Sequence, residues 1–162
     1  MEQIIINRDT LILKVKTYLA VKILFCFMSL VMFLGPLIGL ILWVSDGNRF
    51  HIKFLFGMAF SYAVAYYVLR YTLWNTWGRE ILEFQENQIV HTLDFKFWKR
   101  REVYENTEIE EFGFTPFGYE EDKKGRLYIQ LKGQSIITSI TIPNSDLKKL
   151  INRLENSASF RY

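Results

Sequence analysis

The feature that most constrains this chain is an uncharged apolar run from Ile23 to Val44. It contains 22 residues and is bounded by Lys22 and Asp46. In an α-helix with a rise of about 1.5 Å per residue, such a run crosses a hydrocarbon core of about 30 Å. A secretory signal peptide has a shorter apolar region, of about 7–15 residues, that ends at small residues. The sequence therefore predicts a retained transmembrane helix rather than a cleaved leader.

A second apolar run, from Phe54 to Leu69, follows after a short polar link. It extends toward Trp77 if Arg70 snorkels to the headgroups with its long side chain. The two runs predict a helical hairpin in a bilayer, followed by a soluble domain. The expected segments are an N-terminal flank (1–22), a first transmembrane helix (23–44), an external link (45–53), a second transmembrane helix (54–77) and a cytoplasmic domain (78–162).

Charge is distributed unevenly between the two halves of the chain. Residues 1–79 carry eight Lys/Arg and three Asp/Glu, whereas residues 80–162 carry twelve and fourteen. The overall net charge of +3 therefore belongs to the membrane half, and it does not predict nucleic-acid binding. Basic residues are more frequent beside the N-terminal flank and after the second run than in the link. The positive-inside rule then predicts that both termini are cytoplasmic.

Two groups of residues in the apolar runs have expected roles. Small residues at four-residue spacing lie on one helix face, where they allow another backbone to approach closely. We expect them to pack the two helices together, with homodimerisation as the alternative. The packing residues are Gly35, Gly39, Gly57, Ser61 and Ala65. The second group is typical of an interfacial belt and anchors the inner end of the second helix: Arg70, Tyr71, Trp74 and Trp77.

Beyond Gly78 the hydrophobic periodicity changes from helical to alternating, which is typical of β-strands. Six strands are expected, over residues 80–85, 88–95, 99–104, 107–114, 126–132 and 135–142. Apolar residues then recur at 0, 3, 4 and 7 from Leu147 to Leu154, which predicts an amphipathic helix. The alternating segments 3–6 and 10–16 could add a strand or begin the first helix. The fold class is a membrane α-helical hairpin with a mostly β, α+β soluble domain.

This layout resembles the pleckstrin-homology-like (PH-like) fold. The run Trp74-Asn75-Thr76-Trp77-Gly78-Arg79-Glu80-Ile81-Leu82-Glu83-Phe84, followed by an Arg-Glu-Val-Tyr strand and an Ile-Glu-Glu-Phe strand, is similar to small bacterial two-span proteins with a C-terminal PH-like domain. The layout is also similar to that of photosystem I assembly factors. The family has seven strands where we count six. The resemblance implies a multi-pass protein of the bacterial plasma (inner) membrane.

Catalytic and metal-binding motifs are absent from the sequence. No HxxxH, CxxC, GxSxG or phosphate-binding glycine loop occurs, and the sole cysteine, Cys26, lies in an apolar run. His91 is interpreted as an ordinary sheet residue. The acidic residues Glu108, Glu110 and Glu111 are interpreted as a solvated strand face, on which a bulge could alter the alternation. We expect no catalytic residue, no metal ligand and no cofactor.

One segment of the soluble domain has a composition that indicates a binding surface. Four basic residues are interleaved with three aromatic residues from residue 95 to residue 101, in a domain that is otherwise net acidic. Aromatic rings and cations suit the anionic surface of a membrane, where each cation contributes about 1 kcal/mol. A protein partner or a plain solvated hairpin are the alternatives. The expected membrane-contact residues are Lys96, Phe97, Trp98, Lys99, Arg100 and Arg101.

The sequence thus favours a non-enzymatic integral membrane protein that presents a PH-like domain for protein binding or scaffolding. The expected partners are membrane lipids and another membrane protein or a second copy of the chain, but not nucleic acid. An assembly factor for a membrane complex is one alternative. An oligomeric transport or channel component is the other, since two spans form a path only as an oligomer.

Overall fold

The computed structural model describes residues 3–47, 52–105 and 108–156. The chain divides into two compact units. Lys16–Thr76 forms a helical unit, whereas Met1–Val15 and Trp77–Tyr162 together form a second unit, here called the β domain. The N-terminal residues therefore belong to the same unit as the C-terminal half of the chain.

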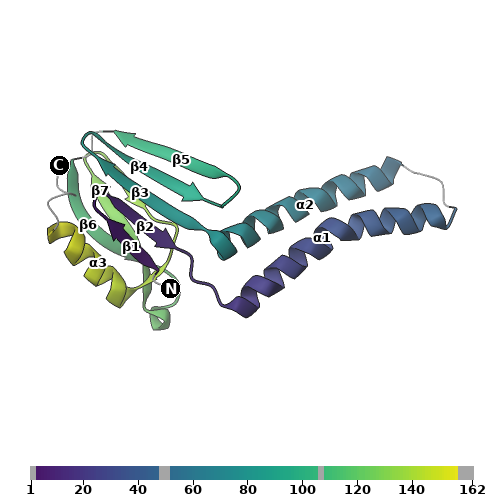
Figure 1. The fold of residues 1–162 in the computed structure, drawn as a ribbon, viewed down its shortest axis with the longest axis horizontal. Helices are drawn as coiled ribbons and strands as arrows, with labels where there is room; N and C mark the ends of the chain where they lie inside the picture. The colour runs from purple at the N-terminus through teal and green to yellow at the C-terminus, as the bar shows by residue number, and fades with distance from the viewer. Residues whose placement is uncertain (1–2, 48–51, 106–107, 157–162) are drawn as a thin grey trace. The chain divides into compact units, whose positions relative to one another are not determined.

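The helical unit is a hairpin of α1 (Leu19–Ser45) and α2 (Ile52–Trp77) (Figure 1). Both helices are long and apolar enough to cross a membrane, and only 6% of the most apolar window of each is buried. A core helix of a soluble protein would instead be mostly buried. Three aromatic pairs link the helices along their length: Phe25–Tyr71, Phe33–Tyr62 and Trp43–Phe54. The Lys22 ammonium also donates to the Thr76 carbonyl at 3.1 Å.

The first sheet of the β domain has five antiparallel strands in the order β1-β2-β3-β4-β5. These are β1 (Ile4–Asn7), β2 (Thr10–Lys14), β3 (Arg79–Gln85), β4 (Gln88–Asp94) and β5 (Lys99–Glu105). Alternation explains why β2 and β3 form strands, because Leu11, Leu13 and Leu82 are fully buried while their neighbours are not. Both N-terminal segments that the sequence left open as strand or helix are therefore strands.

The helical unit is an insertion between two strands that pair with each other. β2 and β3 are antiparallel neighbours with Lys14 opposite Arg79, and the Val15 N–H donates to the Gly78 carbonyl at 3.1 Å. The chain leaves the sheet after β2, forms α1 and α2, and returns to the adjacent position in β3. Residues 4–14, expected as part of a flank, are thus strands of the first sheet.

The second sheet contains β6 (Ile109–Pro116), β7 (Lys124–Leu131), β8 (Gln134–Ile137) and β9 (Ile142–Pro143), with β6 and β8 on either side of β7. A short 3-10 helix, η1 (Glu120–Asp122), lies between β6 and β7. The strand expected over 135–142 is interrupted at residues 138–141. Among the described residues the domain has nine strands rather than six, because two come from the N-terminus and one expected strand is divided.

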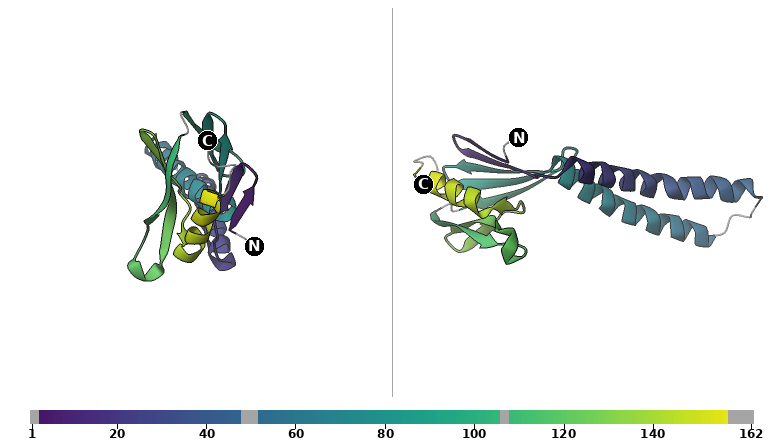
Figure 2. Two further views of the ribbon diagram at one scale, coloured as in Figure 1. Left: turned by 90° about the vertical axis from the view of Figure 1, so that its left-hand side faces the viewer. Right: turned by 90° about the horizontal axis from the view of Figure 1, so that it is seen from below.

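The C-terminal helix α3 (Asn144–Asn156) packs on β6, β7 and β9, and lies beside the second sheet in Figures 1 and 2. Its apolar stripe of Leu147, Leu150 and Leu154 is buried, as the sequence predicted. The predicted coarse layout is confirmed: two long apolar helices, then an antiparallel β domain that ends in an amphipathic helix.

Candidate functional site

The turn between β4 and β5 carries the aromatic and basic residues that the sequence singled out, and we call residues 95–98 the aromatic turn. Phe95 is buried and stacks on the half-buried Trp98 with 5.5 Å between ring centroids. The Phe95 N–H donates to the Trp98 carbonyl at 3.0 Å, and Asp94 Oδ1 accepts from the Lys96 N–H at 2.8 Å. These contacts give the turn a defined shape.

Within this turn Lys96 adopts a left-handed backbone conformation, with φ 76°. Such a conformation is unfavourable for a residue with a β-carbon, and it persists where surrounding contacts impose it. Here it brings the Lys96 ammonium 4.3 Å from the centroid of the Trp77 ring, close enough for a cation–π interaction. The neighbouring Phe97 is 71% exposed. The turn therefore displays an exposed aromatic ring beside a positioned cation.

Strand register places the aromatic turn at the end of the sheet where the helical unit is inserted. One row across four strands runs Lys14, Arg79, Asp94 and Lys99. Adjacent strands are about 4.8 Å apart, so Asp94 lies one strand from Arg79 and two from Lys14. The aromatic turn thus follows β4 at the same end of the sheet where β2 ends and β3 begins.

The basic residues of β5 are not equivalent. Lys99 and Arg101 are exposed, whereas Arg100 donates to Glu102 Oε1 at 2.7 Å although it is also largely exposed. Four of the predicted contact residues are exposed: Lys96, Phe97, Lys99 and Arg101. Trp98 is half-buried and stacks on Phe95. Contact of this surface with a membrane stays a prediction.

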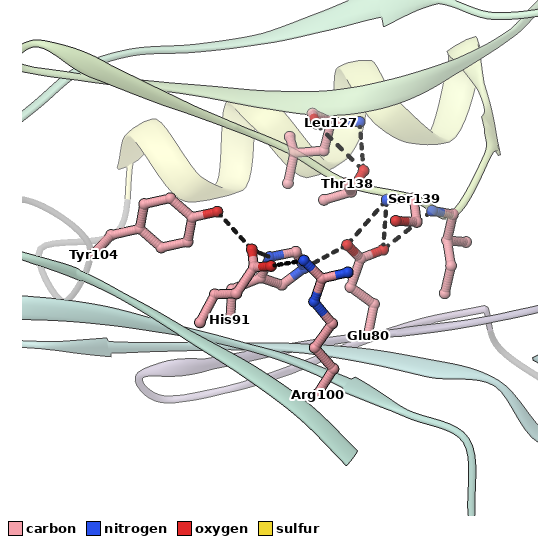
Figure 3. A network of polar contacts seen from close by, with 9 residues as sticks. Glu80, His91, Arg100, Tyr104, Leu127, Thr138 and Ser139 are labelled. Carbon is pink, nitrogen blue, oxygen red and sulfur yellow. Dashed lines mark hydrogen bonds and ion pairs between the residues drawn. The ribbon is translucent and has the colours of Figure 1, made fainter. Parts of the chain in front are cut away.

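A second polar cluster, which sequence reasoning missed, joins the two sheets around Glu80 (Figure 3). Glu80 on β3 has no exposed surface, and its carboxylate accepts from the Ser139 N–H at 2.9 Å and the Ile140 N–H at 3.0 Å. His91 on β4 lies 2.6 Å from Glu80 Oε1 and is also buried. His91 is therefore part of a buried pair, which corrects its interpretation as an ordinary sheet residue. No local sequence pattern indicates this cluster, because Glu80 lies in the first sheet whereas Ser139 and Ile140 follow β8 of the second sheet.

The outer part of this cluster is formed by β5. Tyr104 donates to Glu102 Oε2 at 3.0 Å, and this hydrogen bond lowers the pKa of the Glu102 carboxyl below its usual range. The Arg100 and His91 charges act in the same direction, against the opposing effect of burial. Burial raises the pKa of Tyr104, and the hydrogen bond to Glu102 adds to the rise. Because most of the cluster is buried and internally paired, it holds the sheets together rather than facing a ligand.

The acidic residues at the start of β6 are arranged by a β-bulge. Ile109 pairs with Leu131, but Glu111 pairs with Gln130, so the register shifts between them. Glu108 pairs instead with Lys132 at 3.1 Å. No group of three or more potential metal ligands occurs within the described part of the chain. Glu110 and Glu111 are exposed, in keeping with the solvated strand face that the sequence predicted.

The small residues of the helical unit are placed differently from the packing prediction. A β-carbon added at Gly35, Gly39 or Gly57 would meet nothing within 4 Å, so these glycines do not mediate a close helix–helix approach. Ala65 is fully buried, and Ser61 lines an open groove of about 440 Å³ together with Gly39 and Gly57. The tight polar contact is instead a buried hydrogen bond of 2.8 Å between Ser29 and Thr72. Between α1 and α2 the three glycines make no close contact, and their role in packing, including the alternative of a homodimer, stays a prediction.

The expected interfacial anchors lie in the last two turns of α2. Tyr71 is 56% exposed and packs edge-on against Phe25, while Trp77 is 39% exposed. Arg70 and Trp74 are half-buried. Their exposure is compatible with the interfacial role that the sequence predicted, which stays a prediction.

No family model, no curated protein and no solved structure matches this chain.

Proposed function

We propose that this chain is a non-enzymatic integral membrane protein that holds its β domain against an anionic membrane surface, where the domain binds another protein. In this proposal α1 and α2 cross the bilayer of a bacterial plasma membrane, with both termini cytoplasmic. The basic residues that flank the two helices support this orientation.

The observation that carries the proposal is the row of Lys14, Arg79, Asp94 and Lys99 across the first sheet. The chain runs from this end of the sheet into α1 and returns to it from α2. If both helices span a bilayer, the headgroup region begins within a few residues of this row. Phe97, Lys96, Lys99 and Arg101 then lie where aromatic rings and cations interact favourably with anionic lipid.

We also propose that the β domain is PH-like. Two antiparallel sheets and one C-terminal amphipathic helix support this assignment. The pairing of the N-terminal β2 with β3 supports the hypothesis that this segment adds a strand to a PH-like sheet. Both segments that flank the helical hairpin contribute strands to this domain, β2 before it and β3 after it.

The experiment uses a soluble joined domain in which residues 16–76 are replaced by a single glycine, so that this glycine and Trp77 form a two-residue turn and the Trp77 ring that Lys96 approaches is kept. The hydrogen bond from the Val15 N–H to the Gly78 carbonyl already has the arrangement that closes a two-residue hairpin turn. A fragment that begins at residue 79 is unsuitable, because it lacks β1 and β2. The joined domain is tested for co-sedimentation with vesicles of phosphatidylserine and phosphatidylcholine, and with vesicles of phosphatidylcholine alone.

We expect the joined domain to bind acidic vesicles and to lose binding as salt screens the charges. The double variant Lys99→Gln/Arg101→Gln should lose about 2 kcal/mol, or roughly 25-fold in affinity. Lys148→Gln/Lys149→Gln on α3 removes the same charge elsewhere and serves as the matched control. Equal binding to both vesicle types, or equal losses in the two double variants, would contradict a role for this surface.

A further inference from the structure

β6 forms an open edge of the second sheet. The order of that sheet places β7 on one side of β6, and no other described strand pairs with it. Figure 1 and the left view of Figure 2 show β6 along the outer border of the β domain. An edge strand presents unpaired N–H and C=O groups, which natural proteins protect or use to bind another strand.

The hydrogen bonds of β7 identify which groups of β6 face the open edge. The Thr138 N–H donates to the Leu127 carbonyl at 2.9 Å, and the Leu127 N–H donates to Thr138 Oγ1 at 3.0 Å. Both backbone groups of Leu127 therefore point away from β6. Phe114 lies opposite Leu127. The N–H and C=O of Phe114, and by alternation those of Phe112, must then point to the open edge.

An open groove of about 520 Å³ runs along this edge. Its walls include Phe112, Phe114 and Glu111 of β6, and Lys148 and Ile151 of α3. Ile151 and Phe114 are only half-buried, so apolar surface remains available on the α3 side. The groove thus combines backbone hydrogen-bonding groups with an apolar wall, which is the combination that an added strand requires.

Two further residues suit an edge that another backbone approaches. Gly113 lies in the middle of β6, where glycine weakens a strand, yet an added β-carbon would meet only Tyr128 at an ordinary 3.5 Å. Neither its φ nor its internal packing therefore requires glycine. Pro116 ends the strand at an outward-facing position, where the missing N–H costs β6 no hydrogen bond to β7.

The charges on the groove indicate the chemistry of the occupant. Glu111 is exposed on the face opposite to Phe112, and Glu110 lies beside it at the bulge, whereas the α3 wall of the groove carries the exposed, basic Lys148. A strand added to β6 would place alternate side chains against Ile151 on one face and beside Glu111 on the other. We propose that β6 binds an extended segment of a partner protein as an antiparallel strand, with apolar residues toward α3 and basic residues beside Glu111. This inference names the binding surface for the protein partner of the proposed function, and thus rests on it.

The test uses the full chain in nanodiscs of neutral phosphatidylcholine, so that its outcome does not depend on the acidic-lipid contact. The probe is a fluorescein-labelled synthetic peptide in which valine and lysine alternate, and binding is followed by fluorescence anisotropy. We expect saturable binding that Glu111→Lys weakens by about tenfold, because like charges then lie on neighbouring strands. Glu155→Lys makes the same charge change on the exposed end of α3 and should leave the affinity within about twofold.

Backbone methylation separates strand addition from simple charge attraction. In an antiparallel pair, opposed residues share a sheet face, so the peptide amides that meet Phe112 and Phe114 belong to its valines. Methyl groups on the valine amides should reduce binding by about tenfold or more, whereas methyl groups on the lysine amides should have little effect. Absence of binding to the unmethylated peptide, or equal effects of the two methylation patterns, would overturn the proposal. If the peptide does not bind but the joined domain still binds acidic vesicles, the strand-addition proposal fails and the proposed membrane contact is unaffected.

Discussion

The Glu80 carboxylate illustrates how a single residue connects two sheets. It is fully buried, and its oxygens accept from two backbone N–H groups of the 138–141 segment while one oxygen lies 2.6 Å from His91. Removing a carboxylate from water is costly, and the cost is offset only when hydrogen bonds satisfy its oxygens. His91 and Ile140 are buried, whereas Ser139 is exposed, so water cannot satisfy the His91 and Ile140 groups without a rearrangement.

Glu80→Ala should therefore destabilise the β domain strongly. The substitution leaves His91 and the Ser139 and Ile140 N–H groups without their acceptor, which we expect to cost about 3–5 kcal/mol. Glu83→Ala on the other face of β3 is the matched control and should cost about 0.5 kcal/mol or less. Guanidinium unfolding of the joined domain, followed by tryptophan fluorescence, measures both. Similar small effects would show that the Glu80 network is dispensable.

Among the secondary-structure elements, β2 differs most from what the sequence predicted. It precedes the first apolar helix in sequence but pairs with β3 in space, with Leu11 opposite Leu82 and both fully buried. A large part of the core on this side of the first sheet therefore comes from residues that a linear division of the chain would assign to a flank.

Leu11→Ala tests this role of β2. Loss of a fully buried leucine side chain should cost the β domain about 2–5 kcal/mol. Ile12→Ala changes the neighbouring residue, which is half-buried on the opposite face, and should cost less than half as much. Thermal unfolding of the joined domain compares the two variants. If neither substitution lowered its stability, residues 4–14 would not be part of the folded domain.

The hairpin of α1 and α2 gives a further prediction at the scale of elements. Ser29→Leu inserts volume at a buried contact and removes the hydrogen bond to Thr72, so it should lower the melting temperature of the full chain in mild detergent. Gly39→Leu adds the side chain to open space within the hairpin and should be tolerated. The opposite order of stabilities would show that the glycine face packs against another helix, as in a dimer.

These elements show which parts of the fold can be predicted from the sequence. Alternation located every strand from β3 to β7 to within a few residues, and the apolar stripe located α3, because both signals are local. The pairing of β2 with β3 and the contact of Glu80 with Ser139 join segments that are far apart in the chain, and no local pattern encodes them. The GxxxG spacing was visible, but the bulky pairs Phe33–Tyr62 and Trp43–Phe54 keep the helices apart near those glycines.

For the molecule as a whole, the inserted hairpin gives the β domain two covalent connections to the helices instead of one. Both connections leave the same end of the first sheet, at Val15 and Gly78. A domain tethered through two neighbouring strands has fewer ways to reorient than one tethered by a single linker. Under the proposed function, a weak attraction between the aromatic turn and anionic lipid would therefore suffice, because tethering raises the effective concentration.

The most direct test of this account measures the depth of the aromatic turn in a bilayer. Spin labels are attached to Phe97→Cys or to Asn87→Cys in a chain with Cys26→Ser, and the full protein is reconstituted into acidic liposomes. Residue 87 lies in the turn at the other end of β3, about 23 Å away for a strand of seven residues. We expect power-saturation measurements to place residue 97 among the headgroups, with increased access to oxygen relative to an aqueous nickel chelate, and residue 87 in water. A label at residue 97 that is as accessible to the nickel chelate as the label at residue 87 would contradict the account.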